Sequence, residues 1–179
     1  MALPTPEAKD RITCHVLDTT LGQPARNMRV KLELISFSGN PSSTTSTSTS
    51  STTAATTEAT TSATASPAGP PPTPAPNRIF ESQTDDDGRI KVWLPYSSAT
   101  SSGEVPVYTL EDVFGGLPHS ENNSGISRWT LRFDSAGYFG GVDKTFYPEV
   151  EVSFTVREGE RYHVPLLLAP YAYSTYRGS

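Results

Sequence analysis

The sequence contains few of the residues on which several common kinds of protein site depend. Its 179 residues include one cysteine, Cys14, which excludes an internal disulfide and favours a reducing compartment. No apolar run is long enough to span a bilayer, and residues 1–10 lack the apolar segment of a secretory signal peptide. We therefore expect a cytoplasmic protein with no membrane partner.

Positive charge is also sparse. The chain has 14 Lys and Arg residues against 19 Asp and Glu residues, which gives a formal net charge of −5, and no stretch is strongly basic. Proteins that bind nucleic acid neutralise phosphates with clustered Lys and Arg side chains. We therefore expect no nucleic-acid partner.

One long segment has too little apolar surface to fold. Between residues 41 and 76, every residue except Glu58 is Ser, Thr, Ala, Pro or Gly. Such a segment cannot bury enough apolar area to offset the entropy lost on ordering. We expect a flexible N-terminus over residues 1–10 and a single domain over residues 11–179. A disordered insertion at about 39–77 and a long irregular loop at about 95–126 interrupt that domain.

Short segments of alternating apolar and polar residues occur along the rest of the chain. In residues 12–17, every second residue is apolar on one face, and His15 lies on the other face. The same alternation predicts strands at residues 28–37, 78–84, 89–94, 127–133, 150–156 and 162–176. Three aspartates followed by Gly88 predict a tight turn. Seven to eight short strands with at most one short helix predict an all-β fold, an antiparallel β-sandwich.

Finer predictions follow for two of these strands. In residues 89–94, the alternation places Ile90, Val92 and Leu94 on one face and Trp93 on the opposite face. Near the C-terminus, the three leucines at 166–168 look buried on both faces. A polar, aromatic-rich run follows them, for which an exposed strand tip is the simplest explanation.

Two signatures in the chain resemble those of 5-hydroxyisourate hydrolases, the enzymatic branch of the transthyretin-like family. They are TCHVLDTTLGQPA at residues 13–25, and HVPLLL followed by YSTYRGS within residues 163–179. Asp-Gly-Arg at 87–89 and the segment 137–154 also match. The resemblance covers residues 12–37, about 79–94, and 127–179. It implies a transthyretin-like domain and a homotetramer with sites near subunit interfaces. It also adds the peroxisome as the alternative compartment.

The resemblance also implies a set of site residues. The catalytic residues would be His15, Arg89 and His163, and the substrate-binding residues would be Tyr176, Arg177, Gly178 and Ser179. The third histidine, His119, lies outside the matched motifs, and we expect a structural role for it.

The implied reaction is hydrolysis of 5-hydroxyisourate to 2-oxo-4-hydroxy-4-carboxy-5-ureidoimidazoline in urate degradation, with no metal or cofactor. Water would attack a ring carbonyl of this small-molecule substrate. An imidazole is suited to proton transfer near neutral pH, and a guanidinium can stabilise a developing oxyanion. The sequence leaves open which of the two histidines would be the base.

Other functions are compatible with parts of the sequence. A non-catalytic transthyretin-like protein that binds a small molecule is the main alternative, because fold does not fix function. A zinc site on His15, His163 and Cys14 is disfavoured because adjacent strand residues point to opposite faces. The chain has no Gly-x-Ser-x-Gly motif of a serine hydrolase, and the absence of paired cysteines disfavours an extracellular adhesion domain.

Overall fold

The computed structural model describes residues 9–37, 78–96, 108–117 and 125–179. The predicted insertion at about 39–77, residues 1–8 and His119 lie outside these described residues. So does much of the predicted irregular loop at about 95–126, although its described part contains a helix, α1.

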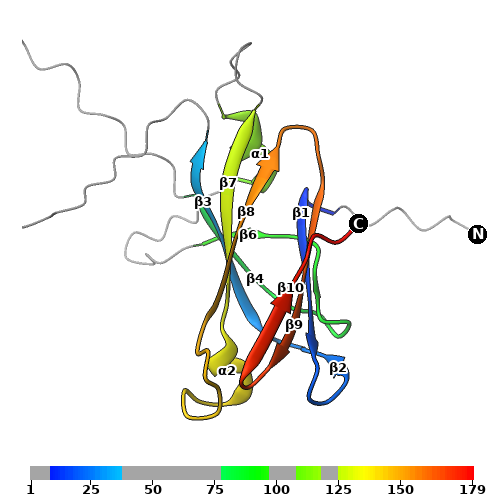
Figure 1. The fold of residues 1–179 in the computed structure, drawn as a ribbon. Coiled ribbons are helices and arrows are strands. Elements are labelled where there is room, and N and C mark those ends of the chain that lie inside the picture. Colours follow the sequence, from blue (N-terminus) through cyan, green and yellow to red (C-terminus); the bar gives the residue numbers. More distant parts are fainter. Residues whose placement is uncertain (1–8, 38–77, 97–107, 118–124) are drawn as a thin grey trace, which may run out of the picture. The chain divides into compact units, whose positions relative to one another are not determined.

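The described residues form two β-sheets (Figure 1). The first has the order β10-β9-β1-β2, and β5 also pairs with β1. Its strands are β10 (Ala172–Thr175), β9 (Tyr162–Ala169), β1 (Ile12–Asp18), β2 (Gln23–Pro24) and β5 (Arg89–Ile90). The second sheet has the order β6-β4-β3-β7-β8. Its strands are β6 (Leu94–Pro95), β4 (Ile79–Gln83), β3 (Arg29–Phe37), β7 (Ile126–Phe133) and β8 (Val150–Arg157).

A single apolar core lies between the two sheets, so the predicted β-sandwich is confirmed. The predicted inward residues of β1 are fully buried, and β3 buries every second side chain from Val30 to Leu34. Residues of both sheets form one buried cluster, whose largest fully buried side chains are Trp129, Phe80 and Phe133. Burying such side chains contributes roughly 1.5–3 kcal/mol each to folding.

The pairing is antiparallel everywhere in the described sheets except between β1 and β9. These two strands run parallel, with Thr13 opposite His163 and His15 opposite Pro165. The Tyr162 amide begins the pairing by donating to the Arg11 carbonyl at 2.7 Å. Parallel strands cannot be joined by a hairpin, and here almost the whole chain separates them. The parallel pair was not predicted, because strand patterns carry no information about which distant strand is the partner.

The predicted turn at residues 85–88 is present, but the strand after it is shorter than predicted. The Gly88 amide donates to the Asp85 carbonyl at 2.9 Å, and β5 contains two residues. Beyond Ile90 the chain leaves the first sheet and joins the second as β6. Trp93 is therefore buried like Ile90, whereas Val92 and Leu94 are exposed, so the prediction that Ile90 shares a face with Val92 and Leu94 is wrong.

Two hydrogen bonds explain the position of Trp93. Its backbone amide donates to Asp10 Oδ2 at 2.7 Å, and its indole Nε1 donates to the Ile12 carbonyl at 2.7 Å. A continuous strand would have placed this ring on the outer face, away from the Ile12 carbonyl. The prediction that the leucines at 166–168 are buried on both faces is also only partly right. Leu166 and Leu168 are fully buried, but Leu167 is only half-buried on the outer face.

The described residues contain two short helices, one more than predicted. Helix α1 (Leu110–Gly115) begins with a capping box formed by Thr109 and Asp112. Helix α2 (Ser135–Phe139) ends at Gly140, which is left-handed with φ of +86°. No helix in the described part of the chain is long and apolar enough to cross a membrane.

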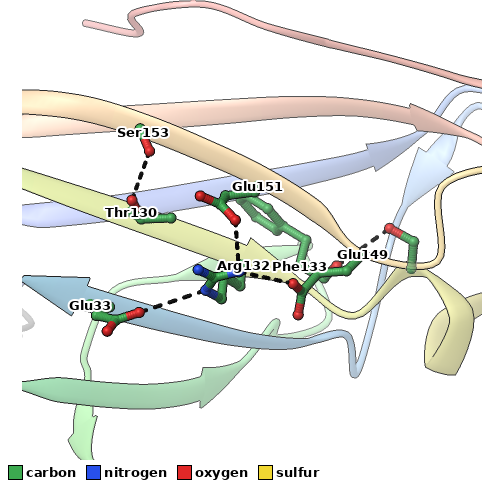
Figure 2. Close-up of polar contacts among 8 residues, drawn as sticks. Glu33, Thr130, Arg132, Phe133, Glu149, Glu151 and Ser153 are labelled. Carbon is green, nitrogen blue, oxygen red and sulfur yellow. Dashed lines mark hydrogen bonds and ion pairs between the residues drawn. The ribbon is translucent and has the colours of Figure 1, made fainter. Parts of the chain in front are cut away.

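The outer face of the second sheet carries a charged cluster on β3, β7, β8 and the residue before β8 (Figure 2). Arg132 lies 2.7 Å from Glu151, 3.1 Å from Glu149 and 3.6 Å from Glu33. The hydroxyl oxygens of Thr130 on β7 and Ser153 on β8 are 2.8 Å apart. Cross-strand pairs of this kind help to fix the register of β7 against its neighbours.

Replacing Gly88 by alanine should destabilise the sandwich. Gly88 has φ of +72°, and an added Cβ would also collide with the Val16 backbone carbonyl. Gly159 has φ of +78° with nothing near its Cβ position, so Gly159→Ala is a matched control that carries the backbone strain alone. We expect Gly88→Ala to lower the free energy of unfolding by about 3 kcal/mol and Gly159→Ala by about 1 kcal/mol in urea denaturation. Equal losses would show that the close approach to β1 is unimportant.

Candidate active site

Strand pairing brings His15, Arg89 and His163 together on the outer face of the first sheet. Arg89 of β5 is directly opposite His15 of β1, and His163 of β9 is opposite Thr13 of β1. The two imidazole ring centroids are 6.4 Å apart, with an angle of 29° between the ring planes. Three side chains from distant parts of the sequence therefore share one small area.

A cleft of about 330 Å³ lies beside these side chains. Arg89, His163, Thr13 and the final residue, Ser179, are among the residues that line it. His15 does not line this cleft, but it lies next to His163. A volume of this size is at the lower end of the range for small-molecule sites.

Cations are the most numerous charged residues in the lining of the cleft. Its lining includes five of them, Lys9, Arg11, Arg89, Lys91 and Arg161, and one acidic side chain, Asp10. Ion pairs partly compensate two of the cations, because Arg11 contacts Glu111 at 2.9 Å and Lys91 contacts Asp85 at 3.6 Å. The cleft therefore favours a ligand that carries or develops negative charge.

The C-terminal residues divide between two places. Gly178 pairs with His163, and its amide donates to the His163 carbonyl at 2.9 Å, which brings Ser179 to the cleft. Tyr176 and Arg177 instead line a second hollow of about 280 Å³, whose lining also includes His163. The Arg177 guanidinium lies 5.1 Å from the Tyr162 ring centroid and 3.3 Å from the Glu160 carboxylate. Of the four terminal residues, only Ser179 lines the cleft, Gly178 lies against the His163 ring, and the other two share a second hollow with His163.

Gly178 is in close contact with the His163 ring. A Cβ atom on Gly178 would lie 2.7 Å from His163 Cδ2, which is closer than real Cβ contacts. The missing side chain is therefore what lets the tail pass beside the imidazole. Thr13 contacts the same ring from another side, with its Oγ1 2.9 Å from His163 Nδ1.

Both imidazoles have a pKa below the ordinary value of histidine. For His15, burial lowers the pKa first and the nearby Arg89 guanidinium lowers it further, against smaller opposing effects of Asp85 and Asp87. For His163, burial again comes first, followed by the positive charges of Arg89, His15 and Lys9. At neutral pH both rings are therefore uncharged, and each has one nitrogen free to accept a proton.

The structure separates Cys14 from the two histidines. Cys14 is fully buried in the core, and burial raises the pKa of its thiol, whereas His15 faces outward. These two adjacent residues therefore cannot bind one ion together. Among the described residues, no group of three or more His, Cys, Asp or Glu side chains has the geometry to hold a metal ion.

A larger hollow, of about 660 Å³, lies on the other sheet. Its lining includes Arg29, Lys31 and Arg132. Arg29 pairs with Asp134 at 2.8 Å, Lys31 lies 4.4 Å from the Tyr96 ring centroid, and Arg132 has three carboxylate neighbours. Because these cations already have partners, we take the smaller cleft beside the imidazoles as the candidate active site.

Reasoning from the sequence missed the other lining residues of the cleft. Thr13 shares the outer face of β1 with His15, so the alternation in residues 12–17 contained the signal for it. Lys9 and Arg161 lie outside the strands, and the Arg161 side chain donates to the Lys9 carbonyl at 2.9 Å. No periodic pattern could have placed these two residues together.

The fold and the cleft define a class of protein: a β-sandwich with two imidazoles and a guanidinium at the outer face of one sheet. The sequence model of the HIUase/Transthyretin family matches residues 12–178. The chain belongs to this family, and the resemblance stated above is confirmed.

Relatives and a solved structure agree with this assignment. A probable 5-hydroxyisourate hydrolase of Schizosaccharomyces pombe is 31% identical over 169 residues, covering 94% of this chain and 90% of the relative. A uric acid degradation bifunctional protein of Arabidopsis thaliana is 33% identical over 171 residues, covering 94% of this chain and 37% of the relative. The crystal structure of an (S)-allantoin synthase superposes with a TM-score of 0.50 at 24% identity, covering 98% of this chain and 45% of that one, which indicates the fold alone.

Removing the Arg89 charge should raise the pKa of both imidazoles. Burial lowers both values and would remain, but the repulsion between Arg89 and a protonated ring would be lost in Arg89→Gln. We expect ¹H NMR titration of the ring protons to show a higher pKa for His15 and for His163. Arg29→Gln, on the other sheet, is the control and should leave both unchanged. Unchanged or lower values in Arg89→Gln would contradict the electrostatic account of the cleft.

Proposed function

We propose that this protein hydrolyses 5-hydroxyisourate, opening its six-membered ring to give 2-oxo-4-hydroxy-4-carboxy-5-ureidoimidazoline. The observation that carries the proposal is the convergence of His163, Arg89 and the nearby His15 at one cationic cleft. The relative from Schizosaccharomyces pombe, which bears the name of a probable hydrolase for this compound, supports the choice of substrate. The substrate is a flat heterocycle dense in carbonyl and N–H groups.

The chemistry needs a base, an oxyanion stabiliser and a proton donor. Water loses a proton to a neutral imidazole as its oxygen attacks a ring carbonyl carbon, and the carbonyl oxygen becomes an oxyanion. Arg89 stabilises that oxyanion with a guanidinium that stays charged at working pH. The carbon–nitrogen bond then breaks, and the leaving nitrogen takes the proton back from an imidazolium. The two imidazoles of the site, His15 and His163, share these proton transfers.

The positive charge of the cleft suits a reaction in which negative charge develops. The attacked amide becomes a carboxyl group, which ionises at neutral pH, so negative charge increases from substrate to product. The lining has five cations against one acidic side chain, and this excess of positive charge stabilises the negative charge as it develops. A site for an apolar hormone-like ligand would be lined by apolar side chains, which disfavours the non-catalytic alternative for this cleft.

We also propose that the protein is a homotetramer built from single transthyretin-like domains over residues 11–179, with sites near subunit interfaces. Four large apolar side chains are exposed in the connections between described strands, where contact with another subunit would bury them, and this supports assembly. These are Leu21, Val142, Phe146 and Tyr171. In this proposal the catalysis uses no metal or cofactor. The Tyr176–Ser179 tail contributes to substrate binding, and its last two residues lie nearest to the cleft and the His163 ring.

The purified full chain should accelerate the decay of freshly generated 5-hydroxyisourate, followed by ultraviolet absorbance. Removing an acid–base group or an oxyanion donor costs a factor of about 10²–10⁴ in rate. We therefore expect losses of this size in kcat/KM for His15→Ala, His163→Ala and Arg89→Ala. Lys31→Ala, on the outer face of the other sheet, is the control and should keep full activity. Wild-type kcat in any of the three variants removes that residue from the mechanism.

Gly178→Ala should reduce activity without unfolding the protein. The new methyl group would occupy the space beside His163 Cδ2 and push the ring or the tail aside. Misplacing a catalytic group by about 1 Å costs roughly a hundredfold in rate, and we expect a loss of that order. Gly115→Ala is the matched control, because nothing lies within 4 Å of its Cβ position. Full activity of Gly178→Ala, with an unchanged unfolding midpoint, would show that the tail does not set the ring position.

A further inference from the structure

Thr13 makes two contacts through one hydroxyl group. Its Oγ1 lies 2.9 Å from His163 Nδ1, and Oγ1 also donates to the Tyr162 carbonyl at 3.3 Å. A hydroxyl has a single proton to donate, but its oxygen can accept hydrogen bonds as well. A backbone carbonyl can only accept. When both contacts are made, the hydroxyl proton goes to the Tyr162 carbonyl, so the contact with the ring needs a proton on Nδ1.

The surroundings of His163 leave Thr13 as the orienting group. The charged or titratable groups that act on the ring are Arg89 of β5, His15 of β1 and Lys9, and none of them is a carboxylate. In many hydrolases a carboxylate accepts the Nδ1 proton of the catalytic histidine and fixes its tautomer. At this ring, within the described residues, the hydroxyl oxygen of Thr13 occupies that position. Gly178, against Cδ2, limits rotation of the same ring.

We propose that Thr13 is a positioning residue, which holds neutral His163 in the tautomer with its proton on Nδ1. Nε2 then carries the lone pair and is the atom that takes the proton from the attacking water. The first statement concerns the resting protein alone, and the second rests on the proposed function. Together they assign the general base, which the sequence left open between His15 and His163. In this role Thr13 acts through the ring.

The tautomer can be measured directly in the full chain. Long-range ¹H–¹⁵N correlation spectra of the neutral ring should show a protonated, pyrrole-like Nδ1 and an unprotonated, pyridine-like Nε2 for His163. Thr13→Ser keeps the hydroxyl and should keep this pattern. Thr13→Val has nearly the same shape without the hydroxyl and should give a mixture of both tautomers. An Nε2-protonated ring in the wild-type protein, or no change in Thr13→Val, would overturn the proposal.

Activity measurements test the second statement. One neutral hydrogen bond contributes about 0.5–1.5 kcal/mol, which corresponds to roughly a twofold to twelvefold effect on rate. We expect Thr13→Val to lower kcat by this factor with KM almost unchanged, and Thr13→Ser to restore kcat. Thr19→Val is the matched control, because Thr19 makes the same kind of hydroxyl bond to the Leu168 carbonyl of β9, at 3.1 Å, beyond the far end of β1. Equal losses in Thr13→Val and Thr19→Val would overturn the positioning role.

The two sets of measurements separate this proposal from the proposed function. If the wild-type protein did not accelerate the decay of 5-hydroxyisourate, the proposed function would fail, and the role of Nε2 as base would fail with it. The NMR spectra would still decide whether Thr13 fixes the tautomer. If the enzyme were active but the ring were protonated on Nε2, the function would stand and the assignment of Thr13 would be wrong.

Discussion

The parallel pairing of β1 with β9 is the interaction on which the site depends. It joins two strands from opposite ends of the described chain and sets Thr13 beside His163 and His15 beside Pro165. A shift by one residue would turn every outward side chain of one strand into the core. The buried residues of both strands, from Ile12 to Leu168, oppose such a shift because their burial depends on this register. The core thus stabilises the geometry of the cleft.

The same register connects the cleft to the hairpin and to the tail. β5 adds Arg89 to the free side of β1, and the Gly88 turn can approach β1 because it has no side chain there. On the other side, Gly178 continues the contact with β9 beyond the end of β10. Two glycines therefore allow backbone to approach the site closely from two directions. The second sheet covers the core and adds none of the residues that line the cleft.

Alternation in the sequence was sufficient to predict the longer strands and the outward face of His15. It was also sufficient for the core residues of β3, because a strand buried on one face has a strict period of two. The family resemblance, and not the spacing, supplied the link between Arg89 and the two histidines. Nothing local in the sequence indicated that β1 and β9 pair in parallel.

The errors of sequence reasoning arose where the chain leaves a regular strand. Trp93 is buried because the chain crosses from one sheet to the other after Ile90, and a tertiary hydrogen bond to the Ile12 carbonyl fixes its ring. Arg177 contacts Glu160 and the Tyr162 ring in a hollow whose lining also includes His163, and the shared motif gave no indication of these two contacts. In both cases the position of the side chain is decided by contacts with residues distant in sequence, which alternation cannot predict.

The central claim is that one small cationic cleft beside two imidazoles binds a flat purine-derived ring. The most direct test is a crystal structure of the full chain with a stable planar analogue of urate that cannot be hydrolysed. The account predicts the ring in the cleft lined by Arg89, His163 and Ser179, with Arg89 donating to its oxygens. An analogue found instead in the hollow beside Arg132, with the cleft empty, would contradict it.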